Sequence, residues 1–202
     1  MTELCSRYVA DPHAARARWL AWLAGGARDV AWALCSIPSE RWTATPPAAD
    51  RLGEWPPARH VRHLALAEQR WFVPVVEAVV EERPLGARSS SELDEVDAAW
   101  DPSLSPEAVG DLVDVLGEGR FAVLQRLESA PDAAWHRPLP SGVAPGPRAA
   151  RLDWLLARAH QHELEHLSTL WALALYWDRS SASTGPGVSL PLQRADRLEE
   201  SR

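Results

Sequence analysis

Histidines gather in two short stretches of the sequence, at a spacing that suits metal binding. One stretch holds His60 and His63, and the other holds His160, His162 and His166. His162 and His166 are four residues apart, so on a helix both rings project from one face, about one turn apart, and can reach a single metal ion. That face continues as an apolar stripe, which predicts that both rings are buried and need partners for their nitrogens.

A third imidazole would complete a catalytic metal site, because such sites use three protein ligands and keep open positions for water or substrate. The other histidine stretch can supply it, and His63 is the expected ligand, with His60 one turn earlier as its competitor. His160 lies about 200° round the helix from His162 and is expected to be a surface residue or to support the ligands from outside. The alternative interpretation of His162 and His166 is a surface or hydrogen-bonded pair without a metal.

Other chemistry finds less support in the sequence. Glu163 and His166 match half of a di-iron carboxylate pattern, but no second Glu-x-x-His exists to complete it. Motifs for dinucleotide, phosphate or acyl chemistry are absent. The glutamates near the histidines, Glu68, Glu163 and Glu165, are either solvated charges or acceptors for the second N–H of a ligand imidazole.

Four helical segments are expected to position these residues. Apolar residues at helical spacing predict helices over residues 13–36, about 57–83, 105–127 and about 148–177. No alternating run predicts a strand, so the fold class is all-α, a four-helix bundle. The roughly twenty residues between the second and third segments exceed what neighbouring antiparallel helices need, and predict a long middle crossover.

Length and composition limit the function classes. A chain of 202 residues that is 46% hydrophobic predicts one domain, over residues 1–179, while the Ser-, Gly- and Pro-rich end, residues 180–202, is expected to be a disordered tail. The net charge of −7 argues against a nucleic-acid partner. The sequence shows neither a signal peptide nor an apolar run of membrane-spanning length, so no membrane partner and a cytoplasmic location are expected.

Two motifs resemble those of the DinB/YfiT-like metalloenzyme family, within it the DinB branch. The first begins at Trp55, with a histidine eight residues on, followed by Leu-Ala and a glutamate; the second is the HxxxH of the last helical segment. The resemblance covers roughly residues 10 to 178. It implies that His63, His162 and His166 are the metal ligands, and that the bundle has up-down-down-up topology. His60 and His160 are extra histidines, expected to be non-ligands.

The resemblance also implies an activity. Characterised members include metal-dependent transferases of low-molecular-weight thiols, such as mycothiol or bacillithiol, and a mycothiol-dependent maleylpyruvate isomerase. We therefore expect thiol transfer to or from an electrophilic small molecule, with zinc as the first choice of metal and nickel or iron as alternatives. Four arginines flank the ligand helices and are expected either to bind polar or anionic groups of the thiol or substrate or to be solvated: Arg59, Arg62, Arg70 and Arg158.

Two other functions stay open on the sequence alone. One keeps the metal but activates water, which gives a metal-dependent hydrolase or lyase of a secondary pathway. The other is a metal-binding bundle without catalysis, such as a scaffold or stress protein that forms a homodimer. All three functions share the same three-histidine site, so the sequence predicts the site without deciding among the three functions.

Overall fold

Helices make up most of the described chain in the computed structural model, which describes residues 12–46, 52–85, 99–140, 143 and 150–183. The helices are α2 (Pro12–Cys35), α4 (Pro57–Ala67), α5 (Val73–Val80), α7 (Pro106–Ser129), α8 (Asp132–His136) and α9 (Leu152–Ser183), with a short 3₁₀ turn at Ser39–Arg41. The described residues form no strand beyond one isolated bridge between Pro138 and Arg151. The predicted all-α class is confirmed.

Helix α7 begins where the sequence predicts. The hydroxyl of Ser105 accepts a hydrogen bond from the backbone N–H of Ala108, at 3.3 Å, and Pro106 occupies the first helical turn. Both features are favoured there, because the first turn of a helix has backbone N–H groups without helical acceptors and proline has none to satisfy.

The second helical segment contains a wide turn in its middle. Helix α4 ends at Ala67, a π-helical turn spans Glu68–Phe72, and α5 follows from Val73. The backbone N–H of Val73 donates to the carbonyl of Glu68, five residues earlier, which is the π pattern. Pro74 lacks an N–H and so cannot supply the next helical bond. The disturbance that Pro74 causes is therefore taken up in the turn before it.

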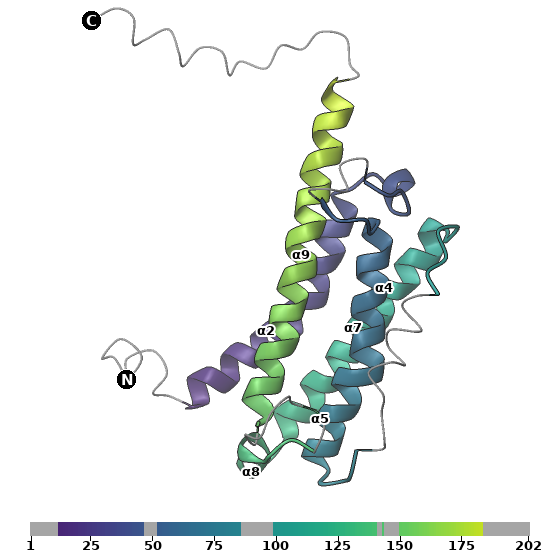
Figure 1. Cartoon of the computed structure of the whole chain (residues 1–202). Coiled ribbons are helices and arrows are strands. Elements are labelled where there is room, and N and C mark those ends of the chain that lie inside the picture. The colour runs from purple at the N-terminus through teal and green to yellow at the C-terminus, as the bar shows by residue number, and fades with distance from the viewer. Residues whose placement is uncertain (1–11, 47–51, 86–98, 141–142, 144–149, 184–202) are drawn as a thin grey trace, which may run out of the picture.

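The helices pack side by side with two directions (Figure 1). Helix α7 runs parallel to the α4–α5 segment, since Arg120 pairs with Glu68 while Arg126, further along α7, pairs with Glu77. Helices α2 and α9 run the opposite way. Each of them therefore enters the bundle from the end at which α5 and α7 finish, and the order of directions along the chain is up, down, down, up.

The core has two apolar clusters with one polar layer between them. Along each helical segment one residue separates the two clusters: Gly26 in α2, Glu68 in the π-helical turn, Arg120 in α7 and Glu163 in α9. Large side chains that are fully buried on either side of this layer include Leu34, Ile37, Leu116, Leu170 and Leu173 in one cluster and Leu23, Phe72, Leu127, Leu155 and Leu156 in the other.

Helix α9 is longer than the sequence predicts. It continues to Ser183, so the tail expected from residue 180 begins inside the helix. Serine and alanine do not stop a helix, and the first strong breaker after Trp177 is Gly185. Residues 184–202, which hold the rest of the predicted tail, lie outside the described residues. Within the ranges described, no helix combines the length and the apolar character needed to cross a membrane.

Candidate metal centre

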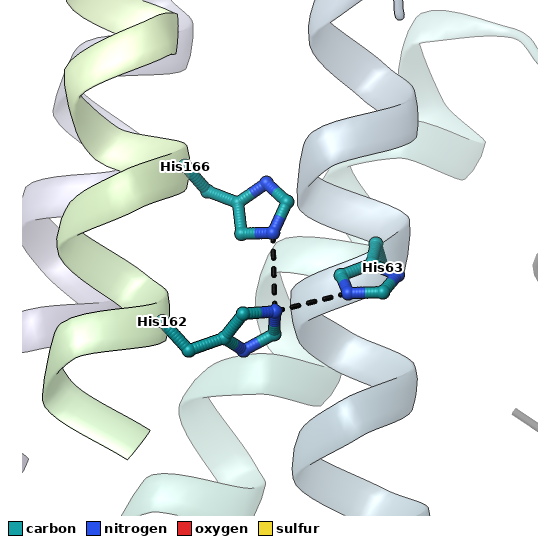
Figure 2. Close-up of side chains that lie close together, drawn as sticks. All are labelled: His63, His162 and His166. Carbon is teal, nitrogen blue, oxygen red and sulfur yellow. Dashed lines mark hydrogen bonds between the residues drawn. The ribbon is translucent and has the colours of Figure 1, made fainter. Parts of the chain in front are cut away.

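Three imidazole rings from two helices meet at mid-bundle (Figure 2). His162 Nε2 lies 3.0 Å from His63 Nε2 and 3.1 Å from His166 Nε2. One nitrogen from each ring lies within 4.8 Å of the other two, and all three side chains are partly buried. Helix α9 supplies two rings because its residues 162 and 166 share a face, and α4 supplies the third because it lies alongside α9.

Trp55 fixes these rings from the loop that precedes α4. Its ring centroid lies 5.3 Å from that of His63, and it stacks on His166 at 6.1 Å with an angle of 22° between the planes. It also contacts His60, with the ring centroids 5.4 Å apart, and the guanidinium of Arg59, whose carbon lies 4.3 Å from the Trp55 ring centroid. A large ring against both ligand helices limits the rotamers that the histidines can adopt.

Burial keeps two of the rings neutral. It lowers the pKa of His162 to about 4, helped by the neighbouring His63 and by Arg158, and it lowers the pKa of His166 to about 3, helped by His162, His60 and His63. Burial acts in this direction because a charged imidazolium loses its hydration. At neutral pH both rings therefore have the neutral form that binds a metal.

The donor set fits a divalent metal. His162 Nε2 faces two nitrogens, Nε2 of His63 and Nε2 of His166. A neutral imidazole carries one N–H, so without a cation among the rings His162 Nε2 can form a hydrogen bond with only one of them. A metal ion accepts a lone pair from all three. Tetrahedral zinc with Zn–N bonds of about 2.05 Å would place its nitrogens about 3.3 Å apart, close to the 3.0 Å and 3.1 Å of the two pairs that include His162.

The structure groups His63, rather than His60, with His162 and His166. His60 is buried, and its Nδ1 lies 2.8 Å from the Nδ1 of His166, on the other side of that ring. His160 points away and packs against Trp22, with the ring centroids 4.8 Å apart. Both extra histidines therefore lie outside the group that His63, His162 and His166 form.

A buried ion cluster lies in the polar layer of the core. Arg120 Nε is 2.8 Å from a carboxylate oxygen of Glu68, and Arg120 Nη2 is 3.0 Å from one of Glu163. All three side chains are at most 4% exposed. The indole N–H of Trp22 donates to Glu163 at 2.8 Å, and the guanidinium carbon lies 4.4 Å from the Trp22 ring centroid.

The cluster holds two carboxyls for one guanidinium. Burial raises the pKa of Glu68 to about 7; Arg120 opposes this effect and Glu163 adds to it. The two glutamates thus bind Arg120, whereas the sequence suggested either solvated charges or partners of a ligand ring. Glu165 is exposed and accepts a hydrogen bond from Gln161.

Arg120 is not among the residues predicted from the sequence, although the sequence carries a signal for it. It falls on the apolar stripe of its helix, four residues after Leu116 and three before Val123. A charged residue at a core position needs a buried partner of opposite charge, and Glu68 and Glu163 occupy the corresponding positions on their helices.

Two glycines make room for these carboxyls. A Cβ added at Gly26 would lie 2.6 Å from a carboxylate oxygen of Glu163, and one added at Gly119 would lie 2.6 Å from Cγ of Glu68. Neither space admits a methyl group without movement of a buried glutamate. These mid-helix glycines therefore have a packing reason.

A cavity of about 620 Å³ opens beside the rings. His60 and Trp55 form the part of its wall nearest the three histidines, and its remaining lining residues are Leu52, Gly53, Glu54, Ser168, Thr169 and Ala172. The cavity therefore offers one carboxylate and two hydroxyls to an occupant. Two of its lining residues, His60 and Trp55, contact the ring cluster.

The four arginines expected to bind substrate lie around the site and not in this lining. Arg59 covers Trp55, and Arg62 donates to the carbonyl of Ala99. Arg70 and Arg158 are exposed, but Arg158 is near enough to His162 to lower the pKa of that ring.

Comparison with known protein families identifies the fold. The family model of the DinB superfamily matches residues 23–170, a range that holds the three histidines and the ion cluster. The chain belongs to the DinB superfamily. No curated protein matches the chain. The same is true of solved structures. Membership of the DinB superfamily therefore rests on the family model, and it agrees with the helical fold and with the candidate metal site.

Proposed function

We propose that the chain is a metal-dependent enzyme that transfers a low-molecular-weight thiol, of the mycothiol type, to or from an electrophilic small molecule. The observation that carries the metal part is the convergence of the nitrogens of His63, His162 and His166. The cavity beside them supports catalysis, because a small molecule could lie within reach of the rings. The thiol part follows from the resemblance to characterised DinB-like transferases.

The three imidazoles would hold a divalent ion, zinc by preference and otherwise nickel or iron. When bound, the ion supplies positive charge that lowers the pKa of a thiol beside it and so makes the sulfur a better nucleophile at neutral pH. His162 and His166 add no charge of their own, since burial keeps them neutral. Neutral imidazole ligands thus leave the charge of the ion available to the thiol.

Other residues of the chain would bind and orient the reactants. Trp55 offers an aromatic wall to the cavity, and Glu54 and Ser168 offer hydrogen-bonding groups. We place the polar or anionic groups of the thiol or substrate near the arginines. Arg59 packs on Trp55, which contacts the ring cluster, and Arg158 is near enough to lower the pKa of His162. Arg62 and Arg70 remain candidates further out. A cytoplasmic location suits this chemistry, because thiols stay reduced there.

A thiol-consumption assay tests the proposal. Metal-loaded protein is mixed with mycothiol, bacillithiol or glutathione and a panel of electrophiles, between pH 6 and pH 8. Free thiols have a pKa of about 8.5 and are mostly protonated in this range. We expect thiol consumption to persist at the lower pH with metal-loaded protein and to be lost together in metal-free protein and in His166→Ala. A fully metallated sample that consumes none of the thiols would contradict thiol transfer and leave the metal site standing.

A further inference from the structure

The two nitrogens of His166 face different partners. Its Nε2 lies 3.1 Å from His162 Nε2, within the ring cluster, and its Nδ1 lies 2.8 Å from the Nδ1 of His60. His60 comes from α4, one turn before His63, and is 8% exposed. The ring of His166 is thus clamped between the cluster and a second buried imidazole.

The chemistry of a metal ligand selects one arrangement of protons here. If Nε2 of His166 gives its lone pair to a metal, its single proton must be on Nδ1. That N–H then points at His60 and needs an acceptor. Nδ1 of His60 can accept when His60 is neutral and has its own proton on Nε2.

We infer that His60 is a positioning residue of the candidate metal centre: it accepts the Nδ1–H of His166 and so fixes the ring and the tautomer that present Nε2 to the metal. Metal-bound histidines commonly donate their other N–H to a carboxylate, a backbone carbonyl or water. In this protein an imidazole takes that place. The inference rests on the proposed metal site and adds a role that the three ligands do not define.

The position of His60 gives this role a further consequence. His60 lines the cavity, whereas His63, His162 and His166 do not. A molecule in the cavity would therefore touch His60, which touches His166. Trp55 packs on both rings and holds the pair together. His60 and Trp55 are thus two lining residues of the cavity that also contact the candidate ligand His166.

Two substitutions of nearly equal shape separate hydrogen bonding from packing. In His60→Asn the side-chain oxygen can take the place of Nδ1 and accept from His166, whereas His60→Leu puts a methyl group there. Zinc affinity is measured by competition with a chelator, and the electronic spectrum of cobalt-loaded protein reports the ligand geometry. His160→Leu in α9 is the control, because His160 packs on Trp22 away from the cluster.

We expect all three variants to bind one metal per chain. His60→Leu should weaken zinc binding about tenfold to a hundredfold, the usual effect of removing such a partner, and should shift the cobalt spectrum. His60→Asn and His160→Leu should stay close to the wild type in both measurements. If His60 served packing alone, the apolar leucine would be the milder of the two changes at this buried position.

Two results would overturn the inference. Wild-type zinc affinity in His60→Leu would show that His166 needs no acceptor, and loss of stoichiometric metal from both His60 variants would make His60 a ligand. In either case the wild-type protein still binds metal, so the proposed metal-dependent function stands. A wild-type chain that binds no metal would instead contradict the proposed function, and this inference with it.

Discussion

Gly119→Ala should give a less stable protein than Gly117→Ala, the same substitution two residues earlier in the helix. Both glycines lie inside α7, where alanine is favoured over glycine by about 0.5–1 kcal/mol because it loses less backbone entropy on folding. At Gly117 a new Cβ meets no atom within 4 Å. At Gly119 it would lie 2.6 Å from Cγ of Glu68 and 3.5 Å from Cγ2 of Val73.

The magnitude follows from what Glu68 can do. Its side chain is 2% exposed and paired with Arg120, so it cannot turn aside without breaking a buried ion pair. Forcing extra atoms into a well-packed core costs about 1–3 kcal/mol. The gain in helix propensity is common to both variants, so the difference between them isolates this cost. For a chain of this length, the difference corresponds to about 2–12 °C in thermal midpoint.

Urea denaturation followed by circular dichroism measures both variants against the wild type. Gly117→Ala should raise the free energy of unfolding, and Gly119→Ala should fall below Gly117→Ala by the amount given above. Equal stabilisation by the two substitutions would contradict this prediction. It would mean that Glu68 moves freely and that the ion cluster is not held as the structure shows.

Two further predictions concern the same cluster. Arg120→Met leaves two buried carboxyls without their cation and should lower the free energy of unfolding, measured by urea denaturation, by about 3–5 kcal/mol. The control Arg126→Met, whose partner Glu77 is partly exposed, should lower it by less than about 1 kcal/mol. Similar losses in the two variants would contradict a buried cluster. Because the pKa of Glu68 is about 7 in the folded protein against 4.5 when exposed, folding takes up a proton between these values. Stability should therefore be highest below pH 4.5 as far as this group is concerned and fall as pH rises through 7; Glu68→Gln should flatten that part of the urea midpoint profile, and an unchanged profile would place the titration elsewhere.

The sequence predicts those features that depend on neighbouring residues. The helical segments follow from the spacing of apolar residues, and the start of α7 follows from Ser105 and Pro106. Placing His162 and His166 on one face needs only the helical repeat. The choice of His63 over His60 is harder, because both lie on α4 and only the packing of α4 against α9 decides which ring joins the cluster.

Features that depend on contacts between distant segments cannot be predicted from the spacing of neighbouring residues. Arg120 is 52 residues from Glu68 and 43 from Glu163 in the sequence, so their pairing appears only once the helices are packed. From the sequence alone, Gly119 only lowers the helix propensity of its segment. In the structure it leaves room for the side chain of Glu68. The contact between His60 and His166 likewise depends on the register of two helices.

We expect His63, His162 and His166 to hold one divalent metal. Elemental analysis of the purified protein tests it most directly, after loading with zinc and removal of excess metal, with His162→Ala, His166→Ala and the control His160→Ala treated alike. The wild type and His160→Ala should each hold one metal per chain, and His162→Ala and His166→Ala should hold none in stoichiometric amount. Full metal content in both His162→Ala and His166→Ala would contradict it, because the metal would then be bound elsewhere.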